Sequence, residues 1–162
     1  MARQKYLLFV MAIAIVLILA TSCSPAPPAD QEQAAETLKS FFDRLSTGDY
    51  TGAAELYGGS YETLAAWNPE ITASDTGSLW QNGCQINGLQ CLAVSSSKLA
   101  QQDGDTFVFT VEFSNPDGSL FVQGPCCGAD ATQSPPISQF QVRLQKSPQG
   151  SFLVLDMPVY TP

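Results

Sequence analysis

Between residues 30 and 47, apolar residues recur every three to four positions, which would place them on one face of a helix. They are Ala34, Leu38, Phe41, Phe42 and Leu45. Asp30 followed by Gln33 is typical of a helix start, because side chains there can bond the free backbone N–H groups. Gly48 is typical of a helix end. The pattern therefore predicts one amphipathic helix with a single buried face.

Shorter helical patterns follow this first helix. Asp49 is the expected cap of a second helix, and its apolar side consists of Tyr50, Ala53, Ala54 and Tyr57. Gly58-Gly59 should end it. A third segment starts at Ser60 and must end before Pro69, because the residue before a proline is disfavoured in helix. One further helical turn is expected around residues 79–80.

From Leu92 onward the period of the pattern changes to two, which indicates strands. In residues 106–114 the residues on one face are Phe107, Phe109, Val111 and Phe113. NPDG at 115–118 and SPQG at 147–150 place Pro and Gly where a type I turn prefers them. Other strands are expected at 120–122, 137–146 and 152–160. Strands joined by turns predict an antiparallel sheet covered by the helices, an α+β fold.

The amino terminus has the pattern of an export signal. A basic start, MARQK, precedes a 15-residue apolar run from Tyr6 to Ala20. This order is typical of a secretory signal peptide, predicted here as residues 1–22. An uncleaved membrane anchor is the alternative, although a spanning helix needs roughly 20 apolar residues.

The residues that follow this run indicate how the protein is attached. LATSC, residues 19–23, resembles the lipobox of bacterial lipoproteins, with Ala20 where that family prefers Leu. The resemblance implies that Cys23 is the lipidated first residue of the mature protein. Residues 23–30 then read as a lipidated cysteine and a Pro-rich extended tether. A single domain is predicted over residues 31–162.

Charge narrows the range of partners. The chain has 7 basic and 15 acidic residues, a formal net charge of −8. Loss of residues 1–22 removes Arg3 and Lys5, which changes the charge to −10. Such a domain repels nucleic acid and anionic lipid headgroups, so neither is an expected partner. We expect membrane attachment through the lipid on Cys23, at the extracytoplasmic face of the cell envelope.

If Cys23 carries lipid, four of the five cysteines remain free to pair. An even number of cysteines outside the cytoplasm favours disulfides. The four are Cys84, Cys91, Cys126 and Cys127. Adjacent Cα atoms lie only about 3.8 Å apart, so a Cys126–Cys127 bond would be strained. The favoured arrangement is crosswise, from residues 126–127 to Cys84 and Cys91. The alternative is Cys84–Cys91 with a strained vicinal bond. Without histidine or a CxxC motif, no metal site and no cofactor is predicted.

Two segments resemble the cystatin-like fold of the nuclear transport factor 2-like superfamily. They are AAETLKSFFDRLSTGDYTGAAELY at 34–57 and FLVLDMPVY at 152–160. The resemblance extends over about residues 30–160 and implies N-terminal helices packed on a curved antiparallel sheet. It also implies a cone-shaped pocket, and the steroid-isomerase branch of the superfamily uses a carboxylate base with a phenol there. The residues of those types are Tyr50, Tyr57, Tyr61 and Asp156.

Asp156 interrupts the apolar stretch LVLDMPV. A buried carboxylate there would indicate a functional group. The favoured interpretation places Asp156 on the outer face of an edge strand with Val154 and Pro158. Arg143 would then be within reach of a surface ion pair.

The absence of histidine excludes Ser-His-Asp and Cys-His catalysis. The sequence therefore favours a non-enzymatic, lipid-anchored domain that binds a small apolar molecule or another envelope protein. The alternative is a small isomerase- or hydratase-type enzyme that uses a Tyr–Asp pair in the pocket.

Overall fold

A computed structural model describes residues 29–125, 130–132 and 134–161. The helices are α2 (Ala29–Thr47), α3 (Tyr50–Ala54), α4 (Glu62–Trp67) and α5 (Thr76–Gln85). The strands are β1 (Ala93–Asp103), β2 (Thr106–Ser114), β3 (Phe140–Lys146) and β4 (Phe152–Val154).

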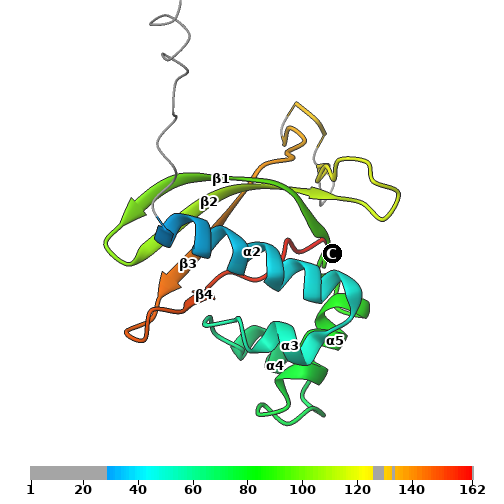
Figure 1. Ribbon diagram of the computed structural model, residues 1–162. Helices are drawn as coiled ribbons and strands as arrows, with labels where there is room; N and C mark the ends of the chain where they lie inside the picture. Colours follow the sequence, from blue (N-terminus) through cyan, green and yellow to red (C-terminus); the bar gives the residue numbers. More distant parts are fainter. Residues whose placement is uncertain (1–28, 126–129, 133, 162) are drawn as a thin grey trace, which may run out of the picture.

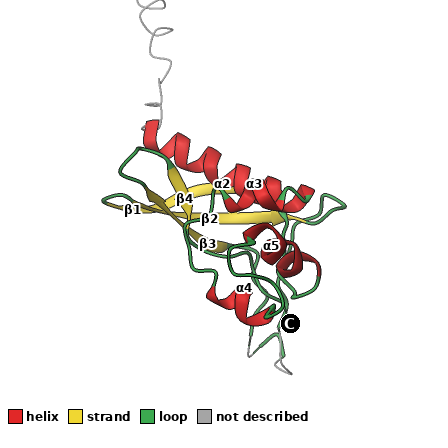
Figure 2. Cartoon of the chain, turned by 90° about the horizontal axis from the view of Figure 1, so that it is seen from below, coloured by secondary structure: helices red, strands yellow, loops and turns green. Residues whose placement is uncertain are grey.

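The fold is α+β, as the sequence pattern predicts. The four strands form an open antiparallel sheet in the order β1-β2-β3-β4, and α2 lies across one face of it (Figure 1). Figure 2 shows the helix and the sheet as two layers. At the β4 edge, residues 56–58 run alongside the strand, with Val154 N donating to Leu56 O and Gly58 N donating to Val154 O, both at 2.8 Å. The β1 edge of the described sheet has no such cover.

The buried face of α2 and that of β2 match the prediction residue by residue. On α2 the buried side chains are Ala34, Leu38, Phe41, Phe42 and Leu45. On β2 they are Phe107, Phe109, Val111 and Phe113. Trp80 from α5 is also fully buried and packs edge-on against Phe41, with ring centroids 5.6 Å apart. The apolar faces predicted from the helical and the two-residue periods therefore pack together in one core between α2 and the sheet.

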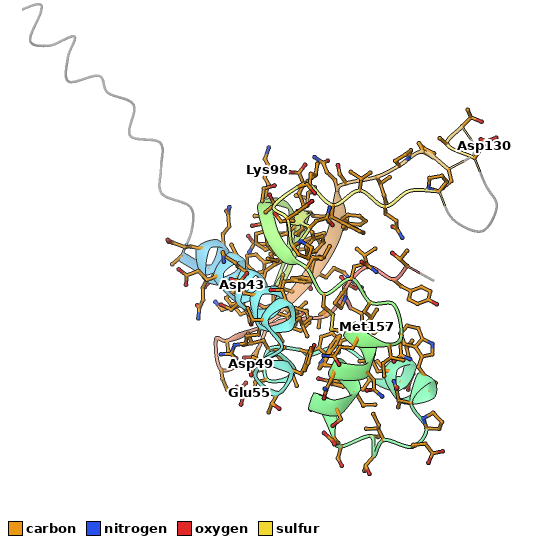
Figure 3. The ribbon with its side chains drawn as sticks, turned by 90° about the vertical axis from the view of Figure 1, so that its right-hand side faces the viewer. Asp43, Asp49, Glu55, Lys98, Asp130 and Met157 are labelled. Carbon is orange, nitrogen blue, oxygen red and sulfur yellow. A yellow bond between two sulfur atoms is a disulfide. The ribbon has the colours of Figure 1, made fainter. Side chains whose placement is uncertain are left out.

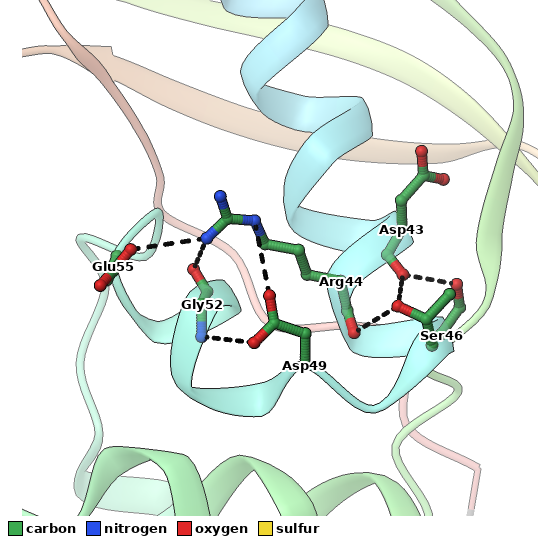
Figure 4. A network of polar contacts seen from close by, with 7 residues as sticks. Asp43, Arg44, Ser46, Asp49, Gly52 and Glu55 are labelled. Atoms are coloured by element: carbon green, nitrogen blue, oxygen red, sulfur yellow. Dashed lines mark hydrogen bonds and ion pairs between the residues drawn. The ribbon is translucent and has the colours of Figure 1, made fainter.

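The corner between α2 and α3 is held by polar contacts of one arginine (Figure 4). Gly48 has a φ of +85°, which ends α2 as predicted. Asp49 caps α3 by accepting a hydrogen bond from Gly52 N. Arg44 Nη1 donates to Gly52 O at 2.6 Å and lies 3.5 Å from Glu55 Oε2. This arginine therefore fixes the direction in which the chain leaves α2.

The start of α2 differs from the prediction. The helix begins at Ala29, two residues inside the expected tether, and Asp30 lies in its first turn. The carboxylate of Asp30 pairs with Lys146 Nζ at 2.6 Å, at the end of β3. An acidic side chain is favourable in the first turn of a helix, and this one also ties α2 to the sheet.

Several elements differ in length from the pattern. In residues 120–122 only Leu120 forms a bridge, to Ser114, and no strand forms, because residues 115–125, 130–132 and 134–139 leave the sheet as a projecting arm. β3 begins at Phe140 instead of residue 137, and β4 ends at Val154 instead of residue 160. The expected turn around residues 79–80 is a ten-residue helix, α5, capped by Asp75. Both predicted turns, 115–118 and 147–150, form.

The predicted signal peptide, Cys23 and the Pro-rich part of the tether lie outside the described residues. Among the residues that are described, no helix is long and apolar enough to cross a bilayer.

Candidate functional site

Cys84 and Cys91 form a disulfide, with Cα atoms 5.5 Å apart. The preferred crosswise pairing is therefore wrong, and the Cys84–Cys91 bond of the alternative is present. The reason is local. Cys84 lies near the end of α5, and the chain then turns at Gly88, whose φ is +87°, so that Cys91 returns beside it. Cys126 and Cys127 lie outside the described residues.

The disulfide loop, residues 84–91, holds the end of the chain. Gln90 N donates to Val159 O at 2.7 Å, and Thr161 N donates to Gly88 O at 3.0 Å. Leu89 and Tyr160 form an antiparallel bridge between them. The C-terminal segment, residues 157–161, is therefore fixed against a crosslinked loop rather than continuing as a strand.

A partly open cavity of about 260 Å³, lined mostly by apolar residues, lies between this C-terminal segment and the sheet. Its walls come from α2, β2, β3, the arm and the C-terminal segment, and they consist of Phe42, Phe113, Gln123, Phe140, Gln141, Val142, Met157, Pro158, Val159 and Tyr160. Figure 3 shows Met157 in the interior, between the sheet and the helices. No charged side chain lines the cavity as described.

The cavity lies beside the part of β3 that extends beyond the end of its neighbour β4. In an antiparallel pair, successive residues turn their backbone N–H and C=O groups alternately to one side and the other. Arg143 turns both groups toward β4, since its O accepts from Leu155 N and its N donates to Asp156 Oδ2. Gln141, two residues earlier, turns its groups the same way, beyond the end of β4. Neither backbone group of Gln141 has a hydrogen-bond partner among the described residues.

The rim of the cavity is partly apolar and partly polar. Gln123 Nε2 donates to Tyr160 O at 3.0 Å, which joins the arm to the C-terminal segment. The ring of Tyr160 lies against Trp67, with centroids 5.2 Å apart. On the arm, Val122 and Ile137 remain about half exposed. Apolar surface therefore continues from the cavity onto the arm.

None of the four side chains predicted for a pocket lines this cavity. Tyr57 is 8% exposed and donates to Ser60 O at 3.2 Å. The pKa of Tyr57 is raised to about 12, mainly by burial and in smaller part by the nearby Tyr61 and Asp156. Tyr61 accepts a hydrogen bond from Trp80 Nε1 at 3.1 Å, and burial raises its pKa as well. These two phenols therefore belong to the aromatic core.

Tyr50 lies apart from the other two tyrosines, and its hydroxyl accepts from Gln85 Nε2 at 3.2 Å. It lines a second, polar hollow of about 290 Å³ beside the starts of α3 and α5. The two carboxylates of this hollow, Asp49 and Asp75, already cap those helices. No group of three or more potential metal-binding side chains occurs in the part of the chain that the structure describes.

Asp156 forms the ion pair expected from the sequence. Arg143 Nη2 lies 2.5 Å from Asp156 Oδ1, and Arg143 Nε also donates to the carboxylate, which raises the pKa of the guanidinium. The expected strand face is wrong, because Val154 and Pro158 are buried and β4 ends before Asp156. The Asp156 carboxylate instead accepts the hydrogen bond from Arg143 N, which a backbone carbonyl of a longer β4 would have accepted.

Sequence reasoning missed the cavity because it treated residues 152–160 as one strand. Phe140 and Val142 were recognisable as one face of β3 from their alternation. Pro158 was the available signal that the strand stops, since proline has no N–H to donate to a ladder.

No protein-family model matches this chain. No curated protein matches it significantly either.

Proposed function

We propose that the protein is a lipid-anchored, extracytoplasmic, non-enzymatic binding domain that holds a small apolar molecule in the cavity. The observation that carries the proposal is a partly open 260 Å³ cavity that is lined mostly by apolar residues and by no charged side chain. Binding pockets are usually concave and apolar, with a few placed polar groups. The open backbone groups of Gln141 and the amide of Gln123 are the polar groups here.

The proposed lipid anchor and the proposed extracytoplasmic location are inferred from the sequence alone. The signal peptide pattern and the lipobox resemblance support lipidation at Cys23. Five residues, 24–28, separate Cys23 from the start of α2, and at about 3.1 Å per residue they span roughly 15 Å. The start of α2 would then remain close to the membrane, a source of apolar molecules. The architecture of α2 on an antiparallel sheet supports the nuclear transport factor 2-like fold as a proposal.

Binding can be tested with the mature chain, residues 23–162 with Cys23→Ser, because every described element follows residue 28. N-phenyl-1-naphthylamine, a neutral apolar dye, should gain fluorescence on binding. Val159→Trp should weaken binding at least tenfold, because the larger ring fills the cavity. Val108→Trp, on the outer face of β2, is the matched control and should leave the affinity within twofold.

Native mass spectrometry of the same chain gives an independent measurement. A co-purifying adduct that Val159→Trp excludes would support the proposal. No dye binding together with a clean unliganded mass would overturn it. That outcome would favour recognition of an envelope protein, through the exposed apolar residues of the arm such as Val122 and Ile137.

A further inference from the structure

The cavity offers two kinds of contact, which together restrict its ligand. Most of the residues that line it are apolar, among them the buried Phe42, Phe113 and Val142. Polar groups also face it: the amide of Gln123 and, at the open edge of β3, one backbone N–H and one backbone C=O of Gln141, which have no partner in the described chain. A ligand that fills the cavity displaces water from both backbone groups.

Displacing that water favours a ligand that can replace both hydrogen bonds. A polar group left unpaired after desolvation costs about 1–3 kcal/mol. A pure hydrocarbon would leave the N–H and the C=O of Gln141 unpaired. A hydroxyl group can accept from the N–H and donate to the C=O, and a primary or secondary amide can do the same.

Charge excludes a carboxylate in this position. The lining contains no Lys or Arg, so a bound anion would lose its water without gaining a cation. Arg143 is close in sequence, but its guanidinium is already bonded to Asp156 on the outer side of the strand. A carboxylate at Gln141 would also face the C=O, which cannot donate to it. The acidic net charge of the chain adds to this repulsion.

The side chain of Gln141 does not supply the contact. It lies on the outer face of β3 and donates through Nε2 to Thr110 Oγ1 at 2.9 Å. The backbone and the side chain of this residue can therefore be tested separately.

We infer that the ligand is an uncharged molecule with an apolar body and one hydroxyl or amide group, which exchanges hydrogen bonds with the backbone N–H and C=O of Gln141. This inference rests on the proposed function and specifies its ligand class. A volume of 260 Å³ is small for a drug-sized ligand. The cavity therefore takes a small molecule, or one end of a larger molecule whose remainder lies along the arm.

Competition with the bound dye tests the ligand class, using three compounds of similar size. They are 1-octanol, 1-methoxyheptane and octanoate at pH 8. The alcohol should displace the dye at a concentration at least tenfold below that of octanoate. It should also act at least threefold below the ether, although the ether is the more apolar of the two, because the ether cannot donate to the C=O. An ether that competes as well as the alcohol would overturn the inference.

Substitution of Gln141 tests the contact itself. Gln141→Pro removes the N–H from the open side of β3, where the ladder to β2 does not use it. It should weaken octanol binding at least fivefold. Gln141→Ala keeps the N–H and loses only the side chain, so octanol affinity should stay within twofold. Near-UV circular dichroism unchanged in both variants would show that the fold persists.

The outcomes separate the two proposals. If the dye does not bind the unmodified chain, the proposed function fails. If the dye binds and Val159→Trp blocks it, yet octanol affinity is equal in Gln141→Pro and Gln141→Ala, the binding function stands and the inference about Gln141 is wrong. Stronger competition by octanoate than by octanol would likewise overturn the uncharged ligand class.

Discussion

The Cys84–Cys91 disulfide closes a short loop, so the stability that it contributes can be calculated. The two cysteines are separated by seven positions. The loss of unfolded-chain entropy for a loop of that length corresponds to about 2.4 kcal/mol at 25 °C. Replacing both cysteines by alanine should lower the free energy of unfolding by this amount. For a domain of this size the melting temperature should fall by roughly 10 °C.

The assay is urea denaturation of residues 23–162 with Cys23→Ser, monitored by the fluorescence of Trp67 and the fully buried Trp80. Ile86→Ala is the matched control, because Ile86 lies within the same loop and is 72% exposed. It should change the stability by less than about 0.5 kcal/mol.

Ligand binding gives a second readout, because the disulfide loop holds the C-terminal segment that lines the cavity. Residues of the disulfide loop bond Val159 and Thr161 through their backbones, and Val159 and Tyr160 line the cavity. The double alanine variant should therefore also bind N-phenyl-1-naphthylamine about fivefold more weakly. A stability change below about 0.5 kcal/mol would refute the loop-entropy argument. Unchanged dye binding in a clearly destabilised variant would refute the coupling between loop and cavity.

Three further predictions concern the remaining polar contacts. The pKa of Tyr57 is about 12 in the folded chain and near 10 in the unfolded chain, so the unfolded state loses this proton first as pH rises. The contribution of Tyr57 to the free energy of unfolding should therefore be constant below pH 10 and fall by about 2 kcal/mol between pH 10 and 12. Urea denaturation measures this fall, and Tyr57→Phe should remove it. Arg44→Met should cost about 1 kcal/mol in the same assay through the lost hydrogen bond to Gly52 O, whereas Lys39→Met, which breaks only an exposed pair on α2, should cost less than about 0.5 kcal/mol. Asp156→Asn should cost about 1 kcal/mol, with the difference shrinking in 1 M NaCl, and a loss of several kcal/mol would contradict a solvent-accessible pair.

The core of this fold could be predicted from the sequence because its residues follow simple periods. The five buried positions of α2 and the four of β2 match the predicted faces. Caps and turns with one dominant local cause were also predicted correctly, such as Asp49 at α3 and the turn at residues 147–150. The Arg143–Asp156 pair could be predicted because a short turn sets the register of the two neighbouring strands.

Features that depend on where strands stop were harder to predict. The alternation in residues 152–160 continues past Val154, so the pattern alone suggests a longer strand than β4. The disulfide pairing was also misjudged, because the turn signal of Asn87-Gly88, where the chain reverses and brings Cys91 back to Cys84, was not used. The cavity depends on both features and was therefore missed.

The end of β4 connects the fold to the proposed site. Asp156 bonds the backbone N–H of Arg143, and Pro158 has no N–H to donate, so the chain cannot continue the ladder along β3. It diverges instead to the disulfide loop, where Gln90 N bonds Val159 O. That divergence leaves the backbone of Gln141 uncovered and separates two apolar walls without closing them. The interruption LVLDMPV, for which a buried functional carboxylate was the less favoured interpretation, is better explained as the feature that opens the cavity.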